Sequence, residues 1–215
     1  MGFIESIKER ASQDIKTIVL PEATDLRTLK AVDIIGKEGF AKVILVGKEK
    51  GITIEKAKEL ISNPVYFGMM MLKVGDADGL VSGAAHSTAD TLRPALQIIK
   101  TKPGTKLVSS FNVMVVPNCE YGDNGVFIFS DCGLNSKPNS EELSEIAIAS
   151  SKSFEQLIGG TPKIAMLSYS TYGSAKSEDI DKVREATRLA KEKAPELLLD
   201  GEMQLDSAIV PSVGA

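Results

Sequence analysis

Residues 17–46 read TIVLPEATDLRTLKAVDIIGKEGFAKVILV, and this stretch decides the fold. Its first four residues, TIVL, are mostly β-branched and are stopped by Pro21, which predicts a strand. Residues 25–36 follow, with apolar side chains at the three-residue spacing of a helix face (Leu26, Leu29, Val32 and Ile35). Residues 41–46, AKVILV, predict a second buried strand. A strand–helix–strand unit of this kind closes right-handed onto a parallel sheet.

The same alternation continues along the chain. Further strands are predicted over residues 79–82, 107–116, 126–129, 163–167 and 197–199, and further helices over 53–61, 64–72, 94–100, 139–158 and 178–194. Gly36 is expected to end the first helix. Arg93 is expected to lie outside the helix that starts at Pro94, because a residue before proline disfavours helical geometry. The alternation indicates an α/β protein, and the linker-like residues 101–104 divide it into domains 1–104 and 105–215.

Composition excludes several classes of protein. The 215 residues are 43% hydrophobic and 25% charged, which is ordinary for a globular chain. A net charge of −4 makes nucleic acid and anionic membranes poor partners. The two cysteines and the single histidine cannot supply a four-ligand zinc site without help from carboxylates. Charged residues interrupt the N-terminal stretch and no segment of about 20 apolar residues occurs, so a cytoplasmic protein is expected.

Two loops directly after predicted strands are rich in small and hydroxyl-bearing residues. Residues 82–88 read SGAAHST and are followed by Arg93, and residues 168–176 read SYSTYGSAK and end at Lys176. In open α/β sheets, ligands bind at the carboxyl ends of the strands, where backbone N–H groups and hydroxyls suit a phosphoryl or carboxylate group. The alternative is that these residues only cap helices and form turns. His86 fits an acid–base role, or equally a capping or core role.

Several common nucleotide-binding and hydrolase motifs are absent from the sequence. The runs G-x-x-x-x-G-K-[ST], G-x-G-x-x-G, G-x-S-x-G and H-E-x-x-H are absent, which removes a P-loop and disfavours a nicotinamide-dependent dehydrogenase. Cys119 lies in a polar turn, where a reactive thiol and an inert one are both open readings. Met69-Met70-Met71-Leu72 is expected to be core.

Four strings in these regions resemble the phosphate acetyltransferase (phosphotransacetylase) family. They are VSGAAHSTADTLRP at 81–94, PNCEYGDNG at 117–125, AMLSYSTYGSAK at 165–176 and DGEMQLDSAIV at 200–210, and TIVLPEATDLRTL at 17–29 is similar to the family's start. The resemblance implies a two-domain, three-layer α/β fold like that of isocitrate and isopropylmalate dehydrogenases, with the active site in the interdomain cleft. It also implies transfer of an acetyl group between acetyl phosphate and coenzyme A, with no metal and no tightly bound cofactor. The expected partners are acetyl phosphate, coenzyme A and phosphate, a second copy in a homodimer, and acetate kinase as a pathway neighbour.

The resemblance also implies roles for residues. Arg93 matches the family arginine that contacts coenzyme A, and Cys119 matches a cysteine near the site, to which we assign no covalent role. We expect the two loops to bind substrate through Ser82, Gly83, His86, Ser87, Thr88, Arg93, Ser168, Ser170, Thr171, Gly173, Ser174 and Lys176.

The chain departs from the family pattern in two places. Family members carry a late Ser-Arg pair and an aspartate that is the proposed base, but none of the five arginines here follows a serine. A second family segment, with another arginine that contacts coenzyme A, is missing near residues 50/51. The catalytic residues are therefore unknown. The open alternatives are a catalytically incomplete remnant that binds coenzyme A or phosphate and a phosphate butyryltransferase-like enzyme.

Overall fold

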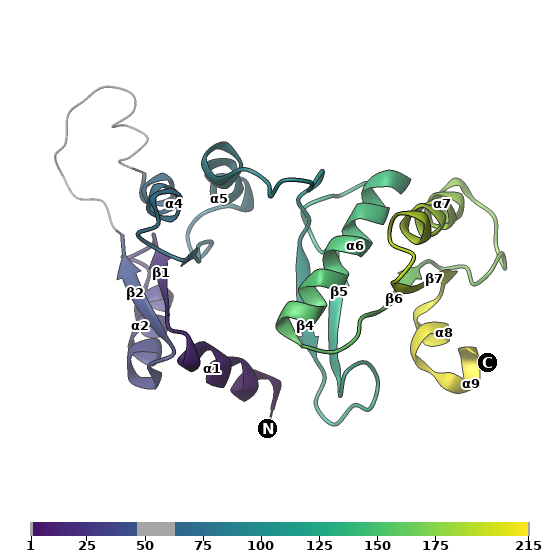
Figure 1. Cartoon of the computed structure of the whole chain (residues 1–215), viewed down its shortest axis with the longest axis horizontal. Coiled ribbons are helices and arrows are strands. Elements are labelled where there is room, and N and C mark those ends of the chain that lie inside the picture. Colours follow the sequence, from purple (N-terminus) through teal and green to yellow (C-terminus); the bar gives the residue numbers. More distant parts are fainter. Residues whose placement is uncertain (1, 47–62, 215) are drawn as a thin grey trace. The chain divides into compact units, whose positions relative to one another are not determined.

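The computed structural model describes residues 2–46 and 63–214. The chain divides into two compact units, Met1–Lys102 and Pro103–Ala215, each of which is described by itself (Figure 1). The helix predicted over residues 53–61 lies outside the described residues. No helix within the described ranges is long and apolar enough to cross a bilayer.

The sheet of the first unit is parallel. Strand β1 (Lys16–Leu20) lies between β2 (Ala41–Leu45) and the short β3 (Gly79–Leu80). Helix α2 (Leu26–Glu38) connects β1 to β2, which confirms the predicted strand–helix–strand unit. The Asp25 carboxylate caps the helix by accepting a hydrogen bond from the Arg27 N–H at 2.8 Å. The end predicted at Gly36 is wrong, because Gly39, with φ 71°, takes the left-handed conformation that ends the helix.

Helix α4 (Pro64–Val74) packs against this sheet, and α1 (Phe3–Gln13) precedes β1. The helix starts at Pro64, as predicted, and Asn63 caps it through the N–H groups of Val65 and Tyr66. Val65 and Val19 are fully buried between helix and strand. Of the methionine run, Met69 is buried but Met70 is exposed, so that run is only partly core.

The structure corrects the prediction at Pro94. Helix α5 (Thr88–Pro94) begins six residues before the proline, and a π-helical turn, η1 (Ala95–Ile99), continues from it. Arg93 is therefore helical. Ser87 starts the helix by capping the Asp90 N–H, and Pro94, fully buried, stands at the last position of α5.

The second unit holds two small sheets. Strands β4 (Phe111–Val115) and β5 (Val126–Ser130) form an antiparallel hairpin, with β4 shorter than predicted. Strands β6 (Lys163–Leu167) and β7 (Leu198–Met203) pair in parallel. Helix α6 (Ser140–Leu157) begins, as predicted, after Asn139, which forms a capping box with Glu142. Helix α7 (Glu178–Lys193) connects β6 to β7, and the short α8 (Leu205–Ile209) and α9 (Pro211–Gly214) follow.

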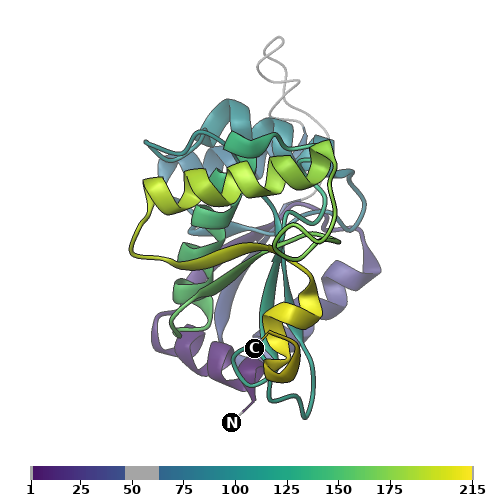
Figure 2. The same ribbon diagram turned by 90° about the vertical axis from the view of Figure 1, so that its right-hand side faces the viewer.

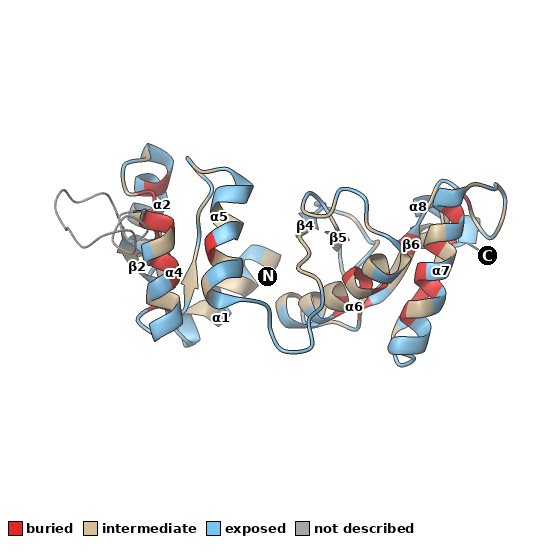
Figure 3. Ribbon diagram, turned by 90° about the horizontal axis from the view of Figure 1, so that it is seen from above, coloured by how far each residue is buried: buried red, intermediate tan, exposed pale blue. Residues whose placement is uncertain are grey.

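The core of the second unit lies where α6 and α7 face each other and the β6–β7 sheet. Figure 2 shows α7 running along β7, and Figure 3 shows buried residues on the facing sides of α6 and α7. The buried cluster comprises Ala147, Met166, Val183, Ala186, Ala190 and Leu199. Alanines on both helices let α6 and α7 approach closely, while the larger side chains of the cluster come from the strands and from Val183 on α7. The mixed α/β class with parallel sheets is confirmed.

Candidate functional site

The first hydroxyl-rich loop wraps around a buried carboxylate, that of Glu22. Glu22 directly follows β1 and Pro21, and only 5% of its surface is exposed. Its Oε2 accepts hydrogen bonds from the N–H groups of Gly83 and Ala84 at 3.0 and 2.9 Å. Its Oε1 accepts from the N–H groups of Ala85 and His86 at 2.6 and 3.0 Å. Four consecutive backbone donors therefore converge on one side chain from about 60 residues earlier in the chain.

The imidazole of His86 completes this arrangement, with Nδ1 lying 2.8 Å from Glu22 Oε1. Burial raises the pKa of the Glu22 carboxyl, but the N–H groups of Ala85, Ala84 and Gly83 and the His86 ring outweigh it and lower the pKa to about 2. Glu22 is therefore an anion at neutral pH. The backbone donors that the sequence offers to a substrate anion are bound instead to this internal carboxylate.

The side chains at the loop's end differ in their availability. Ser87 caps α5 and donates to the Asp90 carboxylate at 2.7 Å, so its hydroxyl is already bound. Thr88 is exposed, and its hydroxyl makes no hydrogen bond with any described residue. Ser82 Oγ is buried without a partner among the described residues. Arg93 is exposed on α5, and its guanidinium forms no hydrogen bond or ion pair within the described ranges.

The second loop is built around another buried carboxylate, that of Glu202 on β7, which is 2% exposed. Its Oε1 accepts from the Gly173 N–H at 2.7 Å and from the fully buried Ser170 hydroxyl at 3.1 Å. Arg184 on α7 binds both carboxylate oxygens, with Nε to Oε2 at 2.9 Å and Nη2 to Oε1 at 3.2 Å. Burial by itself raises the pKa of Glu202, but the hydrogen bonds from Arg184 and Gly173 outweigh this effect and lower the pKa to about 2. Each loop is thus held by one ionised glutamate.

Most hydroxyls of the second loop also have partners within the unit. Ser168 Oγ accepts from the Ser170 N–H at 3.2 Å, and Ser174 Oγ accepts from the Thr171 N–H at 3.1 Å. Thr171 Oγ1 accepts from the Gln204 N–H at 3.0 Å. Lys176 is exposed and has no hydrogen-bond or ion-pair partner in the described part of the chain. Lys176 and Arg93 are therefore the predicted binding cations that remain open to a ligand.

Cys119 lies in the loop between β4 and β5, half-buried and free. A third carboxylate, Asp131, directly follows β5 and accepts from the Ser110 hydroxyl at 2.7 Å and from the N–H groups of Gly133 and Leu134 at 2.8 Å. Burial raises its pKa, and these hydrogen bonds depress the pKa far below the ordinary value. No group of three His, Cys, Asp or Glu side chains that could hold a metal ion occurs in the part of the chain that is described.

Sequence reasoning missed Glu22, Glu202 and Asp131. Each is an acidic residue that lies in a strand or just after one. An acidic residue at such a position is the signal in the sequence that could have identified them. That signal does not identify the partners, because the loops that bind Glu22 and Glu202 lie far away in the sequence.

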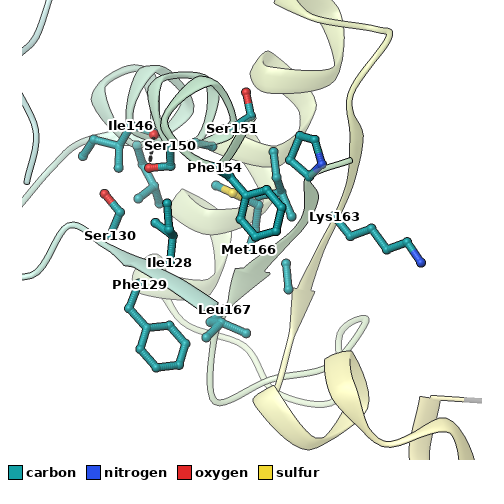
Figure 4. A pocket seen from close by; sticks show the side chains of 15 residues that line it. Ile128, Phe129, Ser130, Ile146, Ser150, Ser151, Phe154, Lys163, Met166 and Leu167 are labelled. Carbon is teal, nitrogen blue, oxygen red and sulfur yellow. Dashed lines mark hydrogen bonds between the residues drawn. The ribbon is translucent and has the colours of Figure 1, made fainter. Parts of the chain in front are cut away.

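The apolar cavity of the second unit is a different feature. About 220 Å³ in volume, it lies between β5, α6 and β6, and Figure 4 shows Ile128, Phe154 and Met166 around it. The Ser150 and Ser151 hydroxyls that line it are bound to the α6 carbonyls of Ile146 and Ile148. It therefore offers no convergent polar groups to a phosphate.

Comparison with known proteins gives a consistent family. A family model described as phosphate acetyl/butaryl transferase matches residues 2–50 and 48–215. The phosphate acetyltransferase of Acetivibrio thermocellus is 56% identical over 252 aligned positions, covering 99% of this chain and 76% of that protein. That of Escherichia coli is 39% identical, covering 99% of this chain and 34% of that protein. The family match breaks at residues 48–50, and the alignments are longer than the 215-residue chain, so the relatives carry residues that it lacks.

Solved structures of phosphotransacetylases are similar to this chain in fold. The EutD phosphotransacetylase from Staphylococcus aureus superposes with a TM-score of 0.83 at 40% identity, covering 99% of this chain and 76% of that one. A phosphotransacetylase from Streptococcus pyogenes superposes with a TM-score of 0.87 at 35% identity, covering 99% and 75%. On its matched length, its identity to these relatives and its fold, the chain belongs to the phosphate acetyl/butaryl transferase family.

Proposed function

We propose that the two glutamate-held loops form the substrate-binding surface of a phosphate acetyltransferase. Phosphate acetyltransferases transfer an acetyl group between acetyl phosphate and coenzyme A. We assign this activity to the chain because it belongs to their family. The observation that supports this site best is the pairing of two preorganised, hydroxyl-rich loops with two cations, Arg93 and Lys176, that have no partner in the described residues. Open cations beside rigid loops suit a ligand that carries phosphate charge.

The chemistry needs groups of this kind. The thiol of coenzyme A loses its proton to a base, and the thiolate attacks the carbonyl carbon of acetyl phosphate. The carbon–oxygen bond to the phosphoryl group breaks, and phosphate leaves with its electron pair. In this scheme Arg93 binds coenzyme A, while Lys176 and the loop hydroxyls of Thr88 and Ser174 bind the phosphoryl oxygens. Cys119 lies near the site and forms no covalent intermediate.

The finer features of the family remain proposals for this chain. We assign residues 1–104 and 105–215 as its two domains, in a three-layer fold of the isocitrate dehydrogenase type with the site in the cleft between them. Its relatives' family membership and the matched folds support this arrangement. We further propose a homodimer, a cytoplasmic location consistent with two free cysteines, acetate kinase as pathway neighbour, and coenzyme A as substrate with no tightly bound cofactor.

Turnover of the chain itself tests the proposal. The purified protein is mixed with acetyl phosphate and excess coenzyme A, and loss of the coenzyme A thiol is followed. Sustained turnover supports the enzyme and shows that the proposed base is supplied within these residues. Binding of coenzyme A by calorimetry without turnover indicates the incomplete binding remnant, and absence of both contradicts the site. Faster turnover of butyryl phosphate than of acetyl phosphate indicates a butyryltransferase.

A further inference from the structure

The contact between Glu22 and His86 determines where the imidazole carries its proton. An ionised carboxylate can only accept hydrogen bonds, so at 2.8 Å the His86 Nδ1 must be the donor. Glu22 is ionised at neutral pH, as its four backbone donors require. In the neutral ring the proton therefore sits on Nδ1, and Nε2 carries the free lone pair.

The ring is also held in place. The His86 backbone N–H binds Glu22 Oε1 at 3.0 Å, the same oxygen that Nδ1 binds, so main chain and side chain are tied to one atom. Glu22 itself is nearly fully buried and fixed by Gly83, Ala84 and Ala85. Rotation of the ring would break the Nδ1 bond and leave a buried charge with one fewer partner, which is costly.

The other ring nitrogen is open. His86 Nε2 has no hydrogen bond with any described residue, and 27% of the side chain is exposed. It is followed in the chain by the α5 N-cap Ser87 and by Thr88, whose hydroxyl has no partner in the described ranges. A fixed ring with one bound and one open nitrogen is the arrangement in which a carboxylate orients a histidine toward a ligand.

We propose that Glu22 is a positioning residue that presents Nε2 of His86 to a phosphoryl oxygen of the acyl phosphate or of released phosphate. The proposal rests on the proposed function and adds a named atom and its orienting partner. Neutral Nε2 accepts from the hydroxyl of monoprotonated phosphate. When the ligand is the dianion of the acyl phosphate, which carries no phosphoryl proton, Nε2 takes a proton from solvent and donates it as an N–H hydrogen bond, while Nδ1–H stays on Glu22.

His86 is the only histidine in the chain, so a ¹⁵N-histidine-labelled sample gives one pair of ring nitrogens to observe. Long-range proton–nitrogen correlation spectra of the full chain are expected to show the Nδ1–H tautomer. Titration with inorganic phosphate is expected to shift Nε2 and leave Nδ1 protonated. Glu22→Gln is expected to abolish the tautomer preference, whereas Glu38→Gln, at an exposed residue paired with Lys8, is expected to leave it unchanged.

A second pair of variants covers the case in which Glu22→Gln fails to fold. His86→Asn places an amide nitrogen near the Nδ1 position and can keep the Glu22 bond, but it has no atom at Nε2. We expect it to keep the wild-type melting temperature and to bind phosphate at least about tenfold more weakly by calorimetry. His86→Gln, which reaches the Nε2 position, is expected to recover part of that loss.

The outcomes separate this inference from the proposed function, because neither measurement needs turnover. An Nε2–H tautomer in the wild type, or phosphate binding that leaves Nε2 unmoved, overturns the inference. So does a His86→Asn variant with unchanged phosphate affinity. An Nε2 response without any acetyl transfer supports the inference and contradicts the enzyme, while transfer without an Nε2 response does the reverse.

Discussion

Arg184 on α7 donates two hydrogen bonds to the Glu202 carboxylate on β7, at 2.9 and 3.2 Å, and the same carboxylate accepts a hydrogen bond from the Gly173 N–H of the second loop. The Arg184 side chain is 40% exposed, whereas the Glu202 side chain is 2% exposed. A helix, a strand and a loop are therefore joined at one buried charge. Glu22 plays the corresponding part for the first loop, with backbone N–H groups and a histidine in place of the arginine.

Arg184→Lys is expected to destabilise the protein by about 1–3 kcal/mol, because an ammonium cannot reproduce the planar two-bond contact to a buried carboxylate. Arg188→Lys on the same helix is the control. Arg188 pairs with Glu185 and Glu192 at the surface, where such pairs contribute about 0–1 kcal/mol. Urea unfolding followed by circular dichroism measures both. Equal losses for the two variants would contradict the special role of the Glu202 contact.

Stability is expected to fall at acid pH through the buried glutamates. The folded-state pKa of Glu22 is about 2 against an ordinary 4.5, so its contribution is fully present above about pH 5 and disappears as the pH falls through 2. That shift corresponds to roughly 3 kcal/mol. Urea midpoints at pH 7, 5 and 3 measure the fall. Glu22→Gln, which does not titrate, should flatten the part of the curve that Glu22 causes, and an unchanged curve would rule that cause out.

Gly173→Ala is expected to cost more than an ordinary left-handed glycine. Gly173 has φ 85°, which costs an L-residue about 1–2 kcal/mol, and an added Cβ would lie 2.7 Å from Arg184 Nη2. Gly39→Ala is the matched control, with φ 71° and no heavy atom within 4 Å of the added Cβ. The difference between the two unfolding free energies reports displacement of Arg184 from Glu202. Equal unfolding free energies would mean that the Arg184 guanidinium can move aside without a loss of stability.

Arg93→Ala is expected to weaken coenzyme A binding about tenfold or more, the effect of losing one hydrogen bond to a charged group. Isothermal calorimetry measures it. Arg188→Ala, which removes an arginine that is already paired at the surface, should leave the affinity unchanged. Equal affinities of the two variants would remove Arg93 from the site.

Thr88 and Ser87 are adjacent but should respond differently to substitution. Ser87→Ala removes the α5 cap and is expected to lower stability by about 1 kcal/mol. Thr88→Ala removes a hydroxyl with no partner in the described residues, so it should leave the melting temperature unchanged and raise KM for acetyl phosphate. Thermal melts and initial rates distinguish the two. An unchanged KM in Thr88→Ala would mean that this hydroxyl does not meet the substrate.

Local patterns predicted the elements that local interactions determine. The helix starts at Asp25, Asn63 and Asn139 each depend on a cap that joins residues at most three positions apart. The exception is Pro94, where the general rule that the preceding residue avoids helical geometry gave way to a helix already started by Ser87. The loops were found by composition.

What organises those loops could not be read from the sequence. The bonds from Glu22 join residues more than 60 positions apart, and those from Glu202 to Ser170 and Gly173 span about 30. Nothing in the spacing of Gly83 to His86 shows that their N–H groups are already bound. A glycine- and serine-rich loop has the same composition whether it waits for a substrate anion or encloses a carboxylate of its own chain.

Strand β5 lies at the edge of its two-stranded sheet. Within the described residues, β4 is the only strand that pairs with β5 and β7 the only strand that pairs with β6, and the apolar cavity lies between β5 and β6. The second edge of β5 is bonded at Val126, which exchanges backbone hydrogen bonds with Asp123, and is unpaired beyond it. The sequence of β5, VFIFS, has no charge and no proline, and Phe129 is 40% exposed. Such a segment is a template for intermolecular strand addition. In concentrated solution this chain is therefore at risk of amyloid-like aggregation that starts at residues 126–130, and a lysine in place of Phe129 is the simplest gatekeeper against it.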